Sequence, residues 1–108
     1  MDTFQWETEK SGDSIRVALI GELDLASTEA LESELRDLEE TGPSELVLDL
    51  RRLKFLDSTG LRVLSGANKR AQEGGHAFRI VKGPEAVQRV FDITGLSDHF
   101  ELVDEEPV

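Results

Sequence analysis

The start of the chain alternates apolar and polar positions with the short period of a β-strand. Residues 4–8 alternate in this way, and residues 15–20 form a second strand-like stretch that ends at Gly21. Residues 10–13 lie between the two stretches and have the composition of a turn. The pattern predicts two strands that pair as an antiparallel hairpin.

The next stretch changes to the longer period of a helix. A helix is expected to start within residues 26–29, with Ser27 as the candidate N-cap. Its apolar positions recur at spacings of four and three, which places them on one face: Leu31, Leu35 and Leu38. The pair Gly42 and Pro43 is expected to end this helix.

Residues 46–50 form a short run that is nearly all apolar. It lacks the alternation of a strand with one wet face, so it predicts a central strand that is buried on both faces. A second helix is expected from Ser58 or Thr59 to Glu73, and the glycine pair that follows is typical of a helix end.

The last quarter of the chain repeats this order of strand and helix. Residues 77–81 predict a further strand, Pro84 opens a third helix, and Gly95 closes it. Residues 100–103 predict a weak final strand, and the acidic tail 104–108 is expected to be frayed.

The order of elements, β-β-α-β-α-β-α with a final β, predicts an α/β fold. Strands separated by helices of this length imply a mixed, mostly parallel sheet of four to five strands with right-handed crossovers. A chain of 108 residues is enough for one domain and too short for two, so residues 1–108 are expected to form a single domain.

The charge of the chain excludes some partners. Twelve basic residues against 23 acidic ones give a net charge of −11, which argues against a nucleic-acid or an anionic-membrane partner. Eight of the basic residues fall within residues 44–83, against four acidic ones. The expected interpretation is a solvated surface, with a patch that faces one acidic partner group as the alternative.

The chain has no cysteine, which excludes a disulfide framework, a thiolate metal site and a thiol nucleophile. No apolar run is long enough to span a membrane, and the first residues lack the features of a signal peptide. We therefore expect a cytoplasmic protein. The carboxylates and histidines show no metal-ligand spacing, so no metal or cofactor is expected.

Two turns follow predicted strands at the places where α/β proteins collect functional groups. The first is Gly21-Glu22-Leu23-Asp24, and the second is Asp57-Ser58-Thr59-Gly60. A hydroxyl at a helix start suits a phosphoryl group, because free amides and the helix dipole favour an anion there. From the second tetrapeptide alone, a helix cap and a turn is the simpler interpretation.

The two turns together, in their order and spacing, carry a family resemblance. With the strand at residues 46–50 and the segment 90–96, Val-Phe-Asp-Ile-Thr-Gly-Leu, they resemble the STAS domains. Among these, the sequence is most similar to the bacterial anti-sigma factor antagonists. The resemblance covers nearly the whole chain, from Phe4 to about Leu102.

The resemblance implies a mechanism. The serine after the aspartate, here Ser58, would be phosphorylated by the partner, an anti-sigma factor that is itself a serine kinase. Unphosphorylated protein would bind that anti-sigma factor and free the sigma factor, phosphorylated protein would let go, and a serine phosphatase would reset it. The protein would then be a kinase substrate with no catalytic residues of its own.

The expected partner-binding residues surround Ser58, and they are Glu22, Asp24, Asp57, Thr59, Gly60 and Arg62. Asp24 and Asp57 have two interpretations: each caps a loop, or they orient the Ser58 hydroxyl and contact the kinase. Thr59 is a second hydroxyl one position on, and it stays open as an additional phosphate acceptor.

Three other classes of protein compete with this interpretation. A receiver-like domain would use Asp49 as phosphoacceptor, with Glu22 and Asp24 as metal-side carboxylates and Lys82 as the late lysine. An enzyme would need a base for Ser58, but His76 and His99 are expected in loops and no G-x-S-x-G elbow is present. A third alternative is a STAS module that scaffolds a larger assembly.

Overall fold

The first two strands form the antiparallel hairpin that the alternating pattern predicts. The computed structural model describes residues 3–104, in which β1 (Gln5–Ser11) pairs with β2 (Ser14–Leu23). Along β2 every second side chain is buried, so one face of the hairpin packs on the core and the other stays outside. Gly21 has a φ of +94°, and a Cβ there would lie 2.0 Å from the Thr3 carbonyl oxygen, so only glycine fits.

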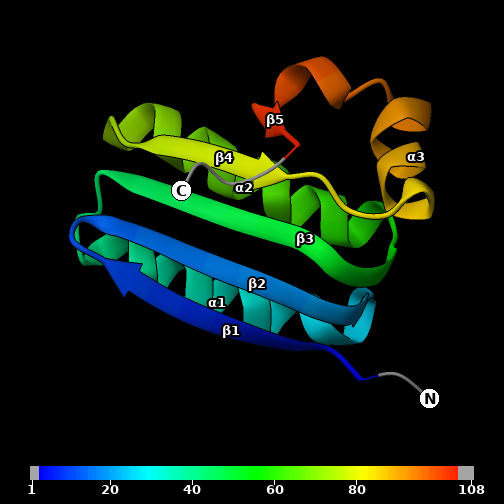
Figure 1. Ribbon diagram of the computed structural model, residues 1–108, viewed down its shortest axis with the longest axis horizontal. Coiled ribbons are helices and arrows are strands. Elements are labelled where there is room, and N and C mark those ends of the chain that lie inside the picture. Colours follow the sequence, from blue (N-terminus) through cyan, green and yellow to red (C-terminus); the bar gives the residue numbers. More distant parts are fainter. Residues whose placement is uncertain (1–2, 105–108) are drawn as a thin grey trace.

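The remaining strands run parallel to β2 and complete a mixed five-stranded sheet. β3 (Glu45–Leu56) lies in the middle, followed by β4 (Ala77–Val81) and the short β5 (Leu102–Val103), in the order β1-β2-β3-β4-β5. Figure 1 shows this sheet with the strands side by side. The predicted α/β class, element order and mostly parallel sheet are therefore confirmed.

Three helices complete the fold. α1 (Leu25–Glu40) and α2 (Ser58–Gly74) lie on the same face of the sheet, and α3 (Glu85–Thr94) lies beyond the carboxyl end of β4 (Figure 1). A short 3₁₀ turn at Ser97–His99 leads into β5. Among residues 3–104, no helix is both long and apolar enough to cross a lipid bilayer.

The core fills the space between the sheet and α1 and α2. Residues 46–50 are all buried, and Leu46, Leu48 and Leu50 of this run join the buried stripe of α1 in the core. These side chains meet the buried face of β2 and the inner positions of α2 and α3, which include Val17, Leu19, Leu61, Leu64, Val87 and Phe91. Burial on this scale supplies most of the stability of such a domain.

Several predicted boundaries are wrong by a few residues. β1 runs to Ser11 instead of residue 8, and β5 begins at Leu102 instead of residue 100. α1 begins at Leu25 with Asp24 as its N-cap, so Ser27 is the third helical residue. β2 runs to Leu23 instead of residue 20, and β3 runs to Leu56 instead of residue 50. Of the predicted tail, Asp104 is described, and residues 105–108 lie outside the described part of the chain.

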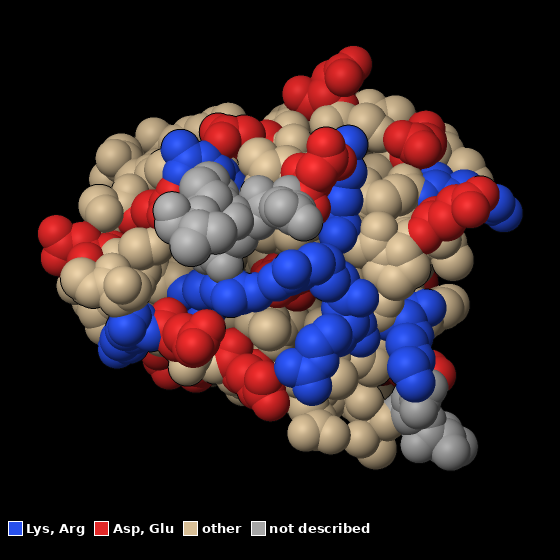
Figure 2. All heavy atoms as spheres, in the orientation of Figure 1, with Lys and Arg blue, Asp and Glu red and all other residues tan. Residues whose placement is uncertain are grey.

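Within residues 3–104, no helix covers the other face of the sheet (Figure 1). Figure 2 views the molecule from this side and shows rows of basic and acidic side chains across the strands. Arg16 of β2 and Arg51 and Arg52 of β3 lie here, beside Glu7 and Glu9 of β1. The sheet is therefore two-sided: apolar side chains face the helices and charged side chains cover the outside.

Candidate functional site

The two turns of the sequence lie next to each other at the carboxyl edge of the sheet. β2 and β3 are parallel neighbours, and their last residues, Leu23 and Leu56, are paired across the ladder. Asp24 follows the first strand and Asp57 the second, and each is the N-cap of the helix that comes next. The fold thus places two strand–cap–helix units side by side, with their helix starts at one edge.

Asp57 caps α2 with a single carboxylate oxygen. Its Oδ1 accepts hydrogen bonds from the amides of Thr59 and Gly60, at 3.0 Å each. Burial alone would raise the pKa of this carboxyl, but hydrogen bonds from the Thr59 hydroxyl and the Gly60 and Thr59 amides outweigh it, and the pKa is lowered. Asp57 is therefore a charged cap that occupies two of the amides at the helix start.

The two hydroxyls after Asp57 have different surroundings. The Thr59 hydroxyl donates to Asp57 Oδ1 at 2.5 Å, and its side chain is half-buried. Ser58 is exposed, and within residues 3–104 its hydroxyl makes no hydrogen bond. At this edge the serine hydroxyl is therefore accessible, whereas the threonine hydroxyl is engaged in a hydrogen bond.

Gly60 packs inward at this edge. It is buried, and a Cβ built on it would lie 2.7 Å from Leu56 Cδ1 and 2.9 Å from Leu23 Cγ. Both leucines are the last residues of their strands, so Gly60 lets the start of α2 settle on the ends of β2 and β3. Its contribution to the site is to position Ser58 and Thr59, because the residue itself is covered.

The first turn is built in the same way. Asp24 Oδ1 accepts from the Ala26 amide at 3.1 Å, and the Ser27 hydroxyl accepts from the Asp24 amide at 3.0 Å. The Asp24 side chain also accepts from the Ser27 amide, and this bond together with the one from the Asp24 amide to the Ser27 hydroxyl forms a capping box, which fixes the start of α1. Glu22 is half-buried and pairs in register with Phe55, whose side chain is 46% exposed.

A shallow hollow of about 230 Å³ opens between the first turns of α1 and α2. It is lined by Leu25, Thr28, Glu29, Glu32, Thr59, Arg62 and Val63. Leu25 is 72% exposed, so it offers apolar surface at the rim of the hollow. The sequence interpretation missed the α1 side of this hollow, although Leu25 lies out of phase with the buried stripe of α1 and was a signal that could have been used.

Arg62 lies on α2 one helical turn after Ser58. Its side chain is exposed, and among residues 3–104 it forms no hydrogen bond or ion pair. Most arginines of the described chain are paired, for example Arg70 with Glu39 at 2.6 Å and Arg52 with Glu7 at 3.0 Å.

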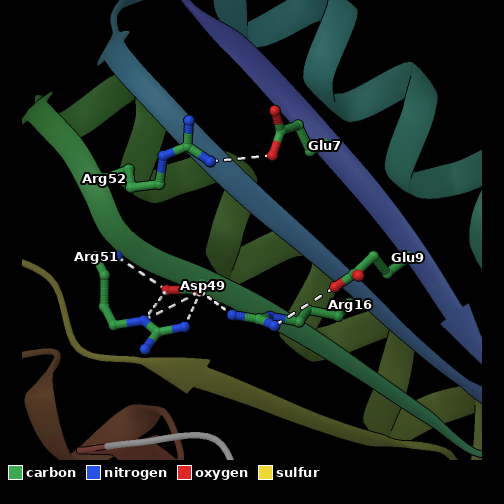
Figure 3. Close-up of polar contacts among 6 residues, drawn as sticks. All are labelled: Glu7, Glu9, Arg16, Asp49, Arg51 and Arg52. Carbon is green, nitrogen blue, oxygen red and sulfur yellow. Dashed lines mark hydrogen bonds and ion pairs between the residues drawn. The ribbon is translucent and has the colours of Figure 1, made fainter.

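Asp49 lies away from this edge, on the uncovered face of the sheet. It is 4% exposed, and its carboxylate accepts from Arg51 Nη2 at 2.7 Å and from Arg16 Nη2 at 2.5 Å (Figure 3). Burial would raise the pKa of this carboxyl, but the bonds from Arg51 and Arg16 outweigh it and hold the pKa well below its usual range. A carboxylate that two guanidinium groups enclose is poorly placed to attack a phosphoryl donor.

The structure thus brings most of the predicted site residues to one edge of the sheet. Glu22 and Asp24 come from the end of β2, while Asp57, Ser58, Thr59 and Arg62 come from the start of α2. Gly60 is at the same edge but buried, and Asp49, the alternative phosphoacceptor, is not part of the group.

Comparison with known proteins agrees with this architecture. The family model of the STAS domain matches residues 5–107, and the chain belongs to this family. An anti-sigma-B factor antagonist from Bacillus subtilis (strain 168) is 32% identical over 96 residues, which are 89% of this chain and 87% of that protein.

Solved structures share the fold. An anti-sigma factor antagonist from Mycobacterium paratuberculosis superimposes with a TM-score of 0.87 at 27% identity, over 95% of this chain and 87% of that chain. The Bacillus cell fate determinant SpoIIAA, solved in its phosphorylated form, has the same fold with a TM-score of 0.71 at 20% identity, over 95% of this chain and 93% of that chain.

Proposed function

We propose that this protein is an anti-sigma factor antagonist whose binding to its partner is switched by phosphorylation of Ser58. The unphosphorylated form binds an anti-sigma factor, which is also a serine kinase, and thereby releases the sigma factor. Phosphorylation of Ser58 ends the binding, and a serine phosphatase restores the active form. The protein itself is a kinase substrate and a protein-binding regulator. The names of its relatives support the antagonist part of this role.

One observation carries the choice of Ser58. Its hydroxyl is exposed and unengaged within residues 3–104, at the first residue of α2, while the neighbouring Thr59 hydroxyl is bound to Asp57. A kinase must bring the acceptor oxygen in line with the γ-phosphate, which requires an accessible hydroxyl. This position favours Ser58 as the single acceptor of the pair.

The same edge has the composition of a docking surface. Leu25 and Phe55 offer exposed apolar area. Around them lie the acidic residues Glu22, Asp24, Glu29 and Glu32, together with Arg62. Apolar side chains within a polar rim are typical of protein interfaces, so the partner is expected to offer apolar side chains and basic groups.

A phosphate on Ser58 would oppose docking through the cost of removing its water. It adds about −1.5 to −2 charges and three acceptor oxygens. The Thr59 and Gly60 amides already bind Asp57, so they are not available to replace the lost water. An uncompensated charge at a close interface costs on the order of several kcal/mol, and about 1.4 kcal/mol is tenfold in affinity.

Incubation with an anti-sigma factor kinase and ATP, followed by peptide mass spectrometry, tests this function. The expected result is one phosphate, on Ser58, and none on the Ser58→Ala variant. A competent kinase that leaves Ser58 unmodified would overturn the proposal.

The stability of the added phosphate separates the serine from the aspartate alternative. A phosphoserine survives acid and base treatment that hydrolyses an acyl phosphate, so the label is expected to persist. A label that is lost in this treatment, and that Asp49→Asn abolishes, would support the receiver-like mechanism instead.

A further inference from the structure

The groups next to Ser58 disfavour a phosphate on its hydroxyl. Helix starts normally hold anions with free amides, but here Asp57 occupies the amides of Thr59 and Gly60. Asp57 is itself negative, because its pKa is lowered. Two of the amides at the helix start are therefore already engaged, and a positive side chain nearby would add to what the helix start offers a phosphate.

Arg62 is placed to be that group. Ser58 and Arg62 are four positions apart on α2, and side chains at this spacing lie one above the other on a helix surface, with Cβ atoms about 5–6 Å apart. Both side chains are exposed, and Arg62 has no hydrogen bond or ion pair with any of residues 3–104. The long guanidinium side chain can thus reach the phosphate without breaking an existing contact.

The charged groups that share the hollow with Arg62, and the residue before Ser58, are negative. Glu29 and Glu32 of α1 line the same hollow as Arg62, and Asp57 precedes Ser58 on the chain. None of them can stabilise a phosphate, and all three increase its need for a cation. Arginine is well suited to the task, since its planar fork donates two hydrogen bonds to one phosphate group.

We propose that Arg62 forms an ion pair with phosphoserine 58 and so acts as the internal counter-charge of the phosphorylated state. The proposal rests on the proposed function for the identity of the modified residue. It gives the switch a second effect: phosphorylation adds an anion to the docking edge and also engages Arg62, which is unengaged by residues 3–104 before modification. A partner group that contacts Arg62 in the unphosphorylated protein would then lose that contact.

A phosphorus NMR titration tests the ion pair without any partner protein. Phosphoserine is installed at position 58 during translation, and the pKa of its second ionisation is measured in the parent and in Arg62→Gln. Loss of an exposed pair is expected to raise this pKa by about 0.3 to 0.7, as follows from typical energies of exposed ion pairs. Arg62→Lys keeps the charge and is expected to restore part of the difference.

Arg36→Gln is the matched control. Arg36 is an exposed arginine of α1 that also forms no hydrogen bond or ion pair with any of residues 3–104, and it does not line the hollow. Its replacement is expected to leave the phosphate pKa unchanged. An Arg62→Gln protein with the parent pKa, or an equal rise in Arg36→Gln, would overturn the proposal. Either result leaves the choice of Ser58 by the kinase untouched, because mass spectrometry measures that separately.

Discussion

At the scale of single residues, the site depends on how differently three neighbouring positions are used. Asp57 is a cap, Thr59 is locked to that cap, and Ser58 is left exposed between them. Gly60 then holds the group against the strand ends. The result is one accessible hydroxyl on a rigid support, which is what a specific kinase acceptor requires.

Thr59 is expected to remain unmodified even when Ser58 is absent. In the Ser58→Ala variant the Thr59 hydroxyl still donates to Asp57 and stays half-buried. Prolonged incubation with the kinase, followed by mass spectrometry, should detect no phosphothreonine. Phosphorylation of Thr59 at a rate near that of Ser58 in the parent would contradict this account of the two hydroxyls.

Two glycines of α2 are expected to respond to alanine with opposite signs. Gly60→Ala forces a methyl group against Leu56 and Leu23, which should lower the free energy of unfolding by about 1–3 kcal/mol. A methyl group in Gly66→Ala meets only Arg70 Nη1, at 3.3 Å, and the Arg70 guanidinium, which Glu39 holds, needs to shift by only a few tenths of an ångström. Gly66→Ala should therefore raise the free energy of unfolding by up to about 1 kcal/mol through helix propensity. Urea denaturation of both variants gives the change in the free energy of unfolding for each. Equal changes in the two variants would show that Gly60 is not a packing position.

At the scale of elements, β3 links the two sides of the molecule. Its inner residues, such as Leu48 and Leu50, lie in the core, while Asp49 faces out and binds Arg16 and Arg51 (Figure 3). Its last residue leads directly into Asp57. A buried carboxylate between two arginines is stable only while all the partners are charged.

Stability is therefore expected to depend on pH through Asp49. The folded-state pKa of Asp49 is lowered, so its contribution is complete above its unfolded pKa of about 4 and is lost as the pH falls through the folded value. At pH 7, Asp49→Asn should lower the free energy of unfolding by about 1–3 kcal/mol. The difference in the free energy of unfolding between Asp49→Asn and the parent should become smaller below a pH of about 4.

Glu7→Gln is the control for this titration. Glu7 pairs with Arg52 on the same face of the sheet, but both side chains are more than half exposed. Its replacement should change the free energy of unfolding by less than about 1 kcal/mol at either pH. A difference between Asp49→Asn and the parent that stays constant from pH 7 to pH 3 would contradict the assignment.

The elements were largely predictable from the sequence, and the exceptions have physical causes. The helical spacing of Leu31, Leu35 and Leu38 predicts α1, and the apolar run at residues 46–50 predicts the buried part of β3; both sets are buried in the structure. The end of β3 was missed because the ladder is irregular between Ala18 and Ile20, where Arg51 and Arg52 follow each other and break the alternation.

The candidate site was predictable in part. Ser58, Asp57 and Asp24 stand in short local motifs, so their place at helix starts could be inferred from sequence alone. The start of α1 was uncertain because Asp24 and Ser27 can each cap a helix, and in the structure they form one capping box. Leu25 was a local signal for one side of the hollow, but the hollow itself could not be predicted, since Glu29 and Arg62 line it together only through the packing of α1 beside α2.

At the scale of the whole molecule, charge is distributed unevenly around the fold. The net charge is −11, yet the uncovered face of the sheet balances much of its charge in ion pairs such as Arg16 with Asp49 (Figure 3). The hollow has two carboxylates, Glu29 and Glu32, against the single cation Arg62. A basic partner would therefore be attracted to this edge before contact.

Association with the anti-sigma factor is expected to show this steering. The on-rate should fall as salt is added, because the Debye length shrinks from about 10 Å at 0.1 M to about 3 Å at 1 M. Glu29→Gln combined with Glu32→Gln should slow association several-fold at low salt, and Glu7→Gln on the sheet face should not. Stopped-flow kinetics would refute steering if the on-rate were independent of salt and of both carboxylates.

The most direct measurement is the affinity of the anti-sigma factor for two forms of the same folded chain, with and without phosphate on Ser58. Calorimetry gives the dissociation constant of each form and hence their ratio, and circular dichroism verifies that each form is folded. We expect the phosphorylated form to bind weaker by about a hundredfold or more, equivalent to about 2.7 kcal/mol, while Ser58→Ala binds like the unmodified protein. Equal affinity of the two forms would contradict the switch.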